Sequence, residues 1–337
     1  MRAAAILGLG CSQKDLKPFQ AGKTQGARST EWRMGMPALH DQADAILVFG
    51  GDGTIHRHLG QLVRLGLPVL VVPAGSGNDF ARALGLPQVR DALAAWQKFC
   101  GGTGNVRTID LGVISAVENA GESLAPHGSR YFCCVAGVGL DGEVSRRANR
   151  LPRWLRGHGG YVLSLAPTIF SFAPVPMKIF TSREAMTRPE SAAELRSAGQ
   201  PGAPPPQHTK TGRAGDPGAV PTNVSWTARS GQPTLLAAFA NAPAYGGGMK
   251  IAPQAKMDDG LLDVCIVGGV DRFKLFCLFP TVYAGRHLTI KGVEYFHANR
   301  VRLETEHPLD VYADGEYVCQ TPVEIAVQHA ALRVVTP

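Results

Sequence analysis

No stretch of this chain approaches the length of about 20 apolar residues that a membrane-spanning helix needs. The hydrophobic run AAAILGLG that follows Met1 and Arg2 is also too short for a secretory signal. Lysine and arginine are scattered, and no dense basic run alternates with aromatic residues, which is the usual sign of a nucleic-acid surface. We therefore expect neither a membrane-spanning protein nor a nucleic-acid-binding one.

Cysteine is present without any pattern that indicates disulfide bonds. The chain has 7 cysteines, an odd number, and Cys133 and Cys134 are adjacent, which does not suit a disulfide framework. A reducing cytoplasm is the expected compartment.

The composition is that of a globular protein. The chain has 337 residues, of which 45% are hydrophobic and 18% charged, and this is enough for two domains with separate cores. Its net charge of +7 would suit an anionic membrane surface.

The most informative stretch is AILVFGGDGT, Ala45–Thr54. Its apolar run is typical of a strand buried on both faces in a parallel sheet, and the glycines that follow allow backbone amides to approach a phosphate chain. Asp52 is unusual there, because a carboxylate repels phosphate unless a divalent cation lies between them or the acid accepts a proton from the attacking hydroxyl. The loop indicates either a structural turn or a site for a magnesium nucleotide.

A second glycine loop, PAGSGNDFAR, follows soon afterwards. LPVLVV, residues 67–72, predicts another buried strand, and the apolar spacing of Ile55–Leu65 predicts a helix between the two strands. A right-handed strand-helix-strand unit brings both loops to the same carboxyl edge of the sheet. Ser76 offers a hydroxyl to phosphate, and Asn78 or Asp79 could cap the next helix. Two such loops at one edge favour a phosphate site over two turns.

GGDGT followed by PAGSGNDFAR resembles the catalytic domain shared by diacylglycerol kinases, sphingosine and ceramide kinases and bacterial soluble lipid kinases. GGDGT also occurs in NAD kinases and 6-phosphofructokinases, whereas GSGNDFAR is more specific. The resemblance continues in family order through IDLG, VGLDGE, YGGGMKIAP, KMDDGLLD and DGE, over most of the chain. It implies an α/β fold, with an N-terminal parallel-sheet nucleotide domain like that of phosphofructokinase or NAD kinase and a β-rich antiparallel C-terminal domain.

The same resemblance implies an ATP-dependent lipid kinase with ATP and Mg²⁺ as cofactors. Its acceptor would be a hydroxyl of diacylglycerol or of a related sphingoid or ceramide lipid, in phospholipid biosynthesis. The implied nucleotide-binding residues are Gly50, Gly51, Asp52, Gly53, Thr54, Gly75, Ser76, Gly77, Asn78 and Asp79. Asp52, Asp314 and Glu316 become the catalytic candidates, and which of them is the base stays open. Asp110 and Asp141 match acidic positions that the family places near the cleft.

KMDDGLLD, Lys256–Asp263, resembles a structural magnesium site of the bacterial lipid kinases. The resemblance makes Asp259 the side-chain ligand and adds the backbone carbonyls of Lys256 and Leu261, a set of oxygen ligands that suits Mg²⁺. Taken alone, the segment predicts an Asp-Gly turn.

The first expected strand, Ala3–Leu9, departs from the family pattern. Relatives end it with an Asn-Pro-x-x-Gly loop, whereas this chain has LGLGCS. A shortened but working nucleotide domain, which we favour, and weakened ATP use both remain open. A NAD kinase should carry an Asn-Glu motif in place of GSGND, and a lipid-binding protein without catalysis would fit the altered loop.

The hydrophobic period changes from helical in Val89–Phe99 to alternating from Val106 onward. We therefore predict a nucleotide domain at 1–104 and a β-rich lipid domain at 105–337. Residues 183–233 are rich in Pro, Gly, Ser, Ala and Thr, and they predict a disordered insertion because little apolar surface offsets the entropy of ordering. The last strand, Ala331–Pro337, could return to the first domain.

A kinase acting on a water-insoluble lipid must meet the bilayer. The sequence predicts peripheral contact through its positive charge and through apolar side chains near Leu151–Leu155 and Phe273–Phe279. Arginines that could face headgroups are Arg146, Arg147, Arg150, Arg153 and Arg156. We expect a lipid substrate and a cytoplasmic location at the inner face of the cell membrane, and we leave a homodimer open.

Overall fold

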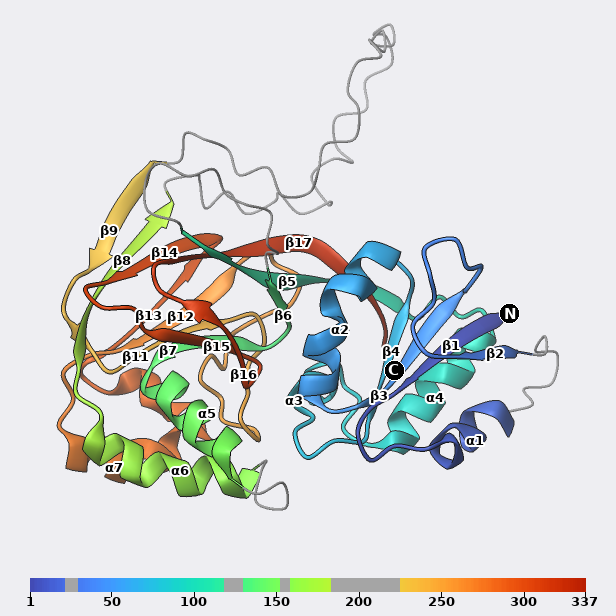
Figure 1. The fold of residues 1–337 in the computed structure, drawn as a ribbon, viewed down its shortest axis with the longest axis horizontal. Coiled ribbons are helices and arrows are strands. Elements are labelled where there is room, and N and C mark those ends of the chain that lie inside the picture. The colour runs from blue at the N-terminus through green and yellow to red at the C-terminus, as the bar shows by residue number, and fades with distance from the viewer. Residues whose placement is uncertain (22–29, 118–129, 152–157, 183–224) are drawn as a thin grey trace, which may run out of the picture.

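The N-terminal part of the chain is a parallel sheet flanked by helices (Figure 1). The computed structural model describes residues 1–21, 30–117, 130–151, 158–182 and 225–337. The first elements are β1 (Arg2–Leu7), α1 (Gln13–Ala21), β2 (Glu31–Met34), β3 (Ala45–Gly50), α2 (Asp52–Leu65), β4 (Val69–Pro73), α3 (Asp79–Ala83) and α4 (Val89–Cys100). The strands lie in the order β4-β3-β1-β2, and each neighbouring pair is parallel.

The central strand β3 is buried along its whole length, as its unbroken apolar sequence predicts. The helix α2 follows it and leads into β4, which pairs parallel with β3 from Ile46–Val69 to Gly50–Pro73. Both glycine loops therefore lie at the carboxyl edge of the sheet, and this prediction is confirmed.

The C-terminal part is a sandwich of two largely antiparallel sheets. Its strands are β5 (Val106–Ala116), β6 (Arg130–Phe132), β7 (Val135–Gly139), β8 (Val175–Ser182), β9 (Trp226–Ser230), β10 (Pro233–Thr234), β11 (Leu236–Ala240), β12 (Leu262–Val267), β13 (Val293–Ala298), β14 (Arg300–Thr305), β15 (Asp310–Ala313), β16 (Glu316–Gln320) and β17 (Val323–Val335). One sheet has the order β13-β12-β11-β7-β15-β16. A buried core that includes Phe132, Phe239 and Ile325 joins it to the strands β5, β8, β14 and β17. The predicted fold class, a parallel-sheet domain followed by an antiparallel one, is confirmed.

Helices cover the lower end of the sandwich in Figure 1. They are α5 (Leu140–Arg150), α6 (His158–Ser171), α7 (Arg272–Leu278) and the 3₁₀ turns η3 (Phe279–Val282) and η4 (Arg286–Thr289). The helix α6 continues through Pro167, a residue type that usually kinks or ends a helix. No helix within the described residues is both long and apolar enough to span a membrane.

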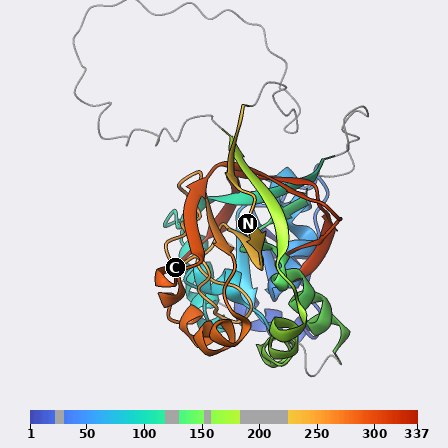
Figure 2. The same cartoon turned by 90° about the vertical axis from the view of Figure 1, so that its left-hand side faces the viewer.

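The two parts share one continuous sheet, because β5 and β17 run from the sandwich into the N-terminal sheet. The strand β17 pairs with β5 from Val323–Ala116 to Val335–Val106, and Val334 pairs with Val69 of β4. Figure 1 shows β17 crossing the molecule, and Figure 2 shows the molecule from its sandwich end. The predicted return of the chain's last strand to the first domain is confirmed, and the domain division at 104 and 105 stays a prediction.

One end of the predicted insertion, 183–233, is corrected by the structure. The strand β9, Trp226–Ser230, falls inside that range, where it pairs with β8 in an antiparallel register that places Ser182 opposite Trp226. Residues 183–224 lie outside the described part of the chain. The sequence did not predict β9 because Trp226 and the nearby Val224 are the only bulky apolar residues in this segment. Pairing with β8, rather than burial in a core, holds the strand.

Candidate functional site

A cleft of about 1880 Å³, open to solvent, lies where the two glycine loops face the sandwich. Ten of the residues predicted for nucleotide binding or catalysis line it: Gly51, Asp52, Gly53, Thr54, Gly75, Ser76, Gly77, Asp79, Asp314 and Glu316. Gly50 and Asn78 do not line it, and neither do the predicted metal ligands Lys256, Asp259 and Leu261. The LGLGCS loop does contribute, through Leu9 and Gly10.

The glycines of the two loops allow the loops to pack directly on each other. A Cβ on Gly51 would lie 2.3 Å from the carbonyl oxygen of Gly77, and one on Gly75 would lie 2.4 Å from Cα of Gly51. The amide of Asp52 donates to that same Gly77 oxygen at 3.0 Å. At Gly51 and Gly75 a side chain is therefore excluded by backbone of the opposite loop.

The Asp52 carboxylate caps the helix α3. Its two oxygens accept hydrogen bonds from the amides of Asp79 and Phe80, each at 3.0 Å. The sequence predicted that Asn78 or Asp79 would cap this helix, but Asn78 instead bonds Gly75 across its own loop. The cap comes from the other glycine loop, so the local sequence could not reveal it.

Burial raises the pKa of Asp52 to about 6. The amides of Asp79 and Phe80 lower this pKa, and the nearby carboxylates of Asp79 and Asp314 raise it. A carboxylate with such a pKa can exchange a proton near neutral pH.

Asp79 connects the second loop to a third glycine-rich segment. Its side chain is 4% exposed, forms an ion pair with Arg82 and accepts the amide of Gly247 at 2.7 Å. Gly247 belongs to the Tyr245–Gly248 turn, which lines the cleft through Tyr245, Gly246 and Gly247. Asp79 thus fixes the position of this turn across the cleft.

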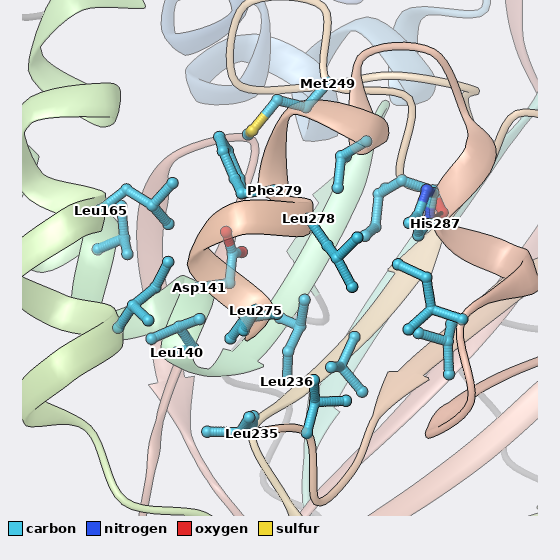
Figure 3. Close-up of a pocket in the computed structure, with 18 of the residues that line it drawn as sticks. Leu140, Asp141, Leu165, Leu235, Leu236, Met249, Leu275, Leu278, Phe279 and His287 are labelled. Atoms are coloured by element: carbon cyan, nitrogen blue, oxygen red, sulfur yellow. Dashed lines mark hydrogen bonds between the residues drawn. The ribbon is translucent and has the colours of Figure 1, made fainter. Parts of the chain in front are cut away.

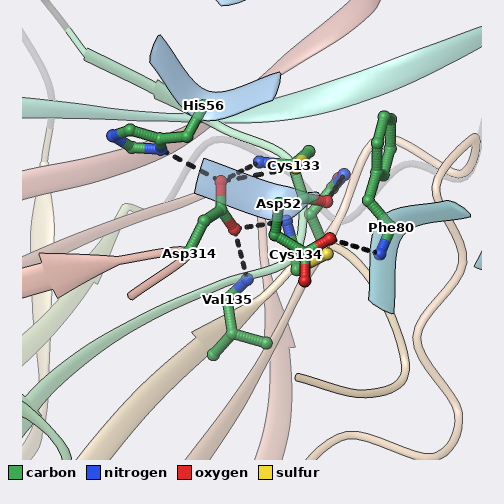
Figure 4. Close-up of polar contacts among 8 residues, drawn as sticks. Asp52, His56, Phe80, Cys133, Cys134, Val135 and Asp314 are labelled. Atoms are coloured by element: carbon green, nitrogen blue, oxygen red, sulfur yellow. Dashed lines mark hydrogen bonds and ion pairs between the residues drawn. The ribbon is translucent and has the colours of Figure 1, made fainter. Parts of the chain in front are cut away.

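The side chain of Asp314 is fully buried and surrounded by donors (Figure 4). One carboxylate oxygen, Oδ1, accepts the amides of Cys134 at 2.8 Å and Val135 at 3.3 Å. The other, Oδ2, accepts the amide of Cys133 at 2.9 Å and lies 3.1 Å from Nδ1 of His56 on α2. Burial alone would raise the pKa of Asp314, but the hydrogen bond and charge of His56 and the backbone amides together hold it below its usual value.

Glu316 lies two residues further along, on the other side of the Gly315 turn. A Cβ on Gly53 would come within 2.9 Å of its Oε1 atom, so the Glu316 side chain rests against the first glycine loop. Arg57, which follows His56 on α2, also lines the cleft and is exposed. Arg57 supplies positive charge beside these carboxylates.

An apolar cavity adjoins the polar cleft (Figure 3). The empty space between its lining atoms, with open solvent at its mouth included, is about 760 Å³, of which about 70 Å³ is accessible to the centre of a water molecule. Nearly all its lining side chains are aliphatic or aromatic, from α5, α6, α7 and the strands β11, β12 and β13. Asp141 and Tyr245 line both this cavity and the cleft, and the Tyr245 hydroxyl donates to Oδ1 of Asp141 at 2.7 Å. The two spaces therefore meet at this polar pair.

The predicted metal segment lies apart from the cleft, beside β5. Asp259 Oδ1 accepts the amide of Leu261 at 3.1 Å, and Asp110 accepts the amide of Gly260 at 2.8 Å. Burial and the negative charge of Asp110 both raise the pKa of Asp259. A cation would relieve this repulsion, so the residues of the loop fit an oxygen-coordinated ion.

Asp110 does not line the cleft, although the resemblance places it near there. Its carboxylate accepts the amide of Ala330 at 2.7 Å and lies 2.8 Å from Nδ1 of His329. These residues form the irregularity in β17 between Gln328 and Leu332. Asp110 therefore fixes the bend at which β17 enters the N-terminal sheet.

The arginines predicted to face headgroups differ in their surroundings. Arg146 and Arg147 form ion pairs with Glu143 of the same helix, at 2.6 and 2.8 Å. Arg150 is exposed, and Arg153 and Arg156 lie outside the described residues.

The sequence did not indicate His56, Arg57 or Tyr245 as parts of the site, whereas Asp141, which the resemblance places near the cleft, does line it. The run YGGG gave a signal, since three glycines after an aromatic residue indicate a tight turn close to another backbone. Nothing in the sequence marked His56 and Arg57 as functional, because a histidine and an arginine on an amphipathic helix are usually surface residues.

Family models match both parts of the chain. The diacylglycerol kinase catalytic domain matches residues 13–114, and the YegS C-terminal NAD kinase beta sandwich-like domain matches residues 134–336. The first match covers the parallel sheet and most of β5, and the second covers the chain from β7 through β17.

Whole-chain comparisons agree with these matches. The chain is 32% identical over 300 residues to a diacylglycerol kinase of Mycobacterium tuberculosis, covering 89% of this chain and 79% of that protein. It is 25% identical to a diacylglycerol kinase of Bacillus subtilis, covering 87% and 78%.

Solved structures share the fold at lower sequence identity. A diacylglycerol kinase from Bacillus anthracis aligns with a TM-score of 0.57 at 16% identity, over 100% of this chain and 97% of that one. Yeast NADH kinase aligns with a TM-score of 0.50 at 8% identity, over 100% and 84%. With both family models and the sequence relatives in agreement, the chain belongs to the diacylglycerol kinase family and is a lipid kinase.

Proposed function

We propose that this lipid kinase transfers the γ-phosphoryl group of ATP to the hydroxyl of diacylglycerol or a related lipid. The observation that carries the proposal is the meeting of a polar, glycine-lined cleft and an apolar cavity at Asp141 and Tyr245. An acyl chain in the cavity would place its polar end at this pair. The cleft would hold the nucleotide.

The nucleotide's phosphates would lie along the two glycine loops. Gly53, Thr54 and Ser76 line the cleft there, and exposed backbone amides and hydroxyls are the donors that phosphate prefers. Arg57 would offset part of the negative charge. The loop that replaces Asn-Pro-x-x-Gly still lines the cleft through Leu9 and Gly10, which supports a shortened but working nucleotide domain.

Asp52 is our candidate for the general base. Its raised pKa, about 6, suits a group that accepts a proton near neutral pH. Asp52 would take the proton of the lipid hydroxyl as the hydroxyl oxygen bonds to the γ-phosphorus and the bond to the β-phosphate oxygen breaks. Mg²⁺ bound with ATP would neutralise the charge that develops on the phosphates.

Asp314 suits a positioning role better than that of a base. Its oxygens already accept three amides and lie beside His56, and its pKa is low. It would hold α2, which carries Asp52, against the start of β7. Glu316, at the cleft beside Gly53, remains a candidate for contact with the nucleotide or its metal.

The Lys256–Asp263 segment would hold a second, structural Mg²⁺ ion. We propose the Asp259 carboxylate and the carbonyls of Lys256 and Leu261 as its ligands. The loop is joined to β5 through Asp110, so the ion would stabilise the joint between the two parts of the molecule.

Contact with the membrane would use the outer face of α6 and α7. Leu163, Phe170, Phe273 and Phe276 expose 60%, 47%, 68% and 43% of their surfaces there. On the inner face of α7, Leu275 and Leu278 line the apolar cavity. Exposed Arg272 and Lys274 would face anionic headgroups. A lipid could thus pass from the bilayer to the cavity beside one helix.

The test is a kinase assay with labelled ATP and a panel of lipids in mixed micelles, with the product identified by mass spectrometry. Diacylglycerol, a monoacylglycerol, sphingosine and ceramide would be compared with NAD as acceptor. We expect a phosphorylated lipid and no NADP. Phosphorylated NAD without phosphorylated lipid would overturn the proposal, and so would lipid binding with no ATP consumption.

A further inference from the structure

Two adjacent thiols lie at the centre of the molecule and have no part in the proposed reaction. Cys133 and Cys134 join β6 to β7, and they are 0% and 2% exposed. Cys134 nevertheless lines the polar cleft. The cleft therefore reaches one thiol of this pair.

The thiols lie beside a carboxylate and an imidazole. The ligand atoms of Cys133, Cys134 and Asp314 all lie within 4.8 Å of one another. Sγ of Cys133 is 3.3 Å from Oδ2 of Asp314, and Nδ1 of His56 is 3.1 Å from the same oxygen (Figure 4). Three side chains from the β6–β7 connection and the β15–β16 turn therefore lie together, with His56 of α2 next to the carboxylate.

The Cys133–Asp314 distance is close to a sulfur–oxygen separation around a tetrahedral zinc ion. Bond lengths of about 2.3 Å to sulfur and about 2.0 Å to oxygen or nitrogen put neighbouring ligand atoms roughly 3.3–3.8 Å apart. Two sulfurs, one imidazole nitrogen and one carboxylate oxygen are also a donor set that thiophilic divalent cations prefer over Mg²⁺.

We propose that Cys133, Cys134 and Asp314, with His56 as fourth ligand, form a binding site for a thiophilic divalent cation such as Zn²⁺. Each thiol releases its proton to solvent as the metal–sulfur bond forms. Without a metal the two thiols are uncharged, because burial raises the pKa of Cys133 well above its usual value. For Cys134 the hydrogen bond with Cys133 lowers the pKa, but burial and the nearby carboxylates raise it further, to about 12.

Occupation of this site would inhibit the enzyme. A cation bound to Oδ2 of Asp314 would replace its hydrogen bond with His56, and α2 carries Asp52 one turn before His56. The ion would thus disturb the same contacts that hold the proposed base. This consequence rests on the proposed function, whereas binding of the ion does not.

The experiment uses the full chain, freed of metal and titrated with Cd²⁺ as a spectroscopic probe. Thiolate-bound Cd²⁺ absorbs in the ultraviolet through charge transfer from sulfur. We expect one tightly bound ion per chain, a weaker band in Cys133→Ser and in Cys134→Ser, and no band in the double variant. Cys277→Ser is the matched control, since Cys277 is exposed and lies on α7, and this variant should keep the full band.

A second measurement needs no variant. Co²⁺ added to the unaltered chain should give the intense visible bands of a tetrahedral site with thiolate ligands. An octahedral Co²⁺ spectrum, or a Cd²⁺ band that survives in the double cysteine variant, would overturn the site. Inhibition of phosphoryl transfer by Zn²⁺ is measured separately, so an inactive preparation does not affect the binding result.

Discussion

The Asp52 carboxylate combines a structural contact with the chemistry proposed for it. It caps α3 through two amides, and the burial that this requires also raises its pKa to about 6. Because the folded pKa lies above the ordinary value of 3.8, ionisation of Asp52 costs stability as pH rises through about 6. An ionised Asp52, as the proposed base, is therefore kept at neutral pH at some expense in folding free energy.

The pH dependence of the reaction follows from this pKa. A general base must be ionised, so kcat/KM for lipid phosphorylation should rise with pH through an inflection near 6 and then level off. Initial rates in constant-ionic-strength buffers would measure it. Asp52→Asn should lose about 10²–10⁴ in rate along with the inflection. A wild-type inflection that persists in residual Asp52→Asn activity would assign the base to another group.

The packing of the two glycine loops gives a second prediction at this scale. In Gly51→Ala the new Cβ would meet the Gly77 carbonyl at 2.3 Å, so the loops must separate and the Asp52 cap should weaken. We expect a lower melting temperature and a large loss of activity. Gly269→Ala is the control, because nothing lies within 4 Å of a Cβ there. Equal behaviour of the two variants would contradict the loop contact.

The sequence predicts the position of a single residue where its neighbours along the chain determine that position. Gly51, Gly53 and Gly75 follow buried strands, so their place at the sheet edge was predictable. The partners of Asp52 and Asp314 were not, because Phe80 and His56 reach them only through the tertiary fold.

Among the elements, the hairpin of β8 and β9 shows where the chain can be shortened. Ser182 and Trp226 are direct partners in this antiparallel pair, so a short turn can join them. Replacing residues 183–224 by an Asn-Gly turn with short flanks should leave the melting temperature and lipid phosphorylation close to those of the full chain. A longer deletion, through Ser230, should be destabilising because it removes β9. Loss of folding in the shorter deletion would contradict this prediction.

The helix α7 gives a prediction about the membrane. Phe273→Ser with Phe276→Ser removes exposed apolar surface while leaving the cavity-lining Leu275 and Leu278 in place. We expect weaker sedimentation with anionic vesicles and slower phosphorylation of bilayer lipid. Activity on a short-chain, soluble lipid should be retained.

Exposed Tyr317, on β16, supplies the control for this pair of changes. Tyr317→Ser removes a side chain that is 48% exposed away from α7. This variant should sediment with vesicles like the unaltered chain. Equal losses on bilayer and soluble substrates in the α7 variant would instead indicate damage to the cavity.

Elements with a clear hydrophobic period were predicted well. The strand β3 and the helix α4 lie close to their expected ranges, because β3 is uniformly apolar and α4 has one apolar face. The strand β9 was missed because its alternating residues are mostly polar and its stability comes from pairing with β8.

At the scale of the whole molecule, β5 and β17 make the two parts one structural unit. Leu332, on β17, is 2% exposed and pairs with Ile109 of β5. Leu332→Ala should cost about 2–5 kcal/mol of unfolding free energy. Hydrogen exchange should then become faster in peptides from both β4 and β14. Arg333→Ala, at an exposed position on the same strand, should change exchange little. Faster exchange confined to one of the two peptides would show that the parts unfold separately.

The shared strand also sets the order in which the two sheets can pair while the protein is being translated. Synthesis proceeds from the N-terminus, so the edge of β4 that β17 will occupy waits, unpaired, until residues 323–335 have left the exit tunnel. The Asp110 carboxylate likewise cannot accept the amide of Ala330 until that part of the chain has been made. The nascent chain can thus build its separate sheets early, yet it joins the N-terminal sheet to the sandwich only after residues 323–335 have emerged, and until then a sheet edge is open to wrong partners.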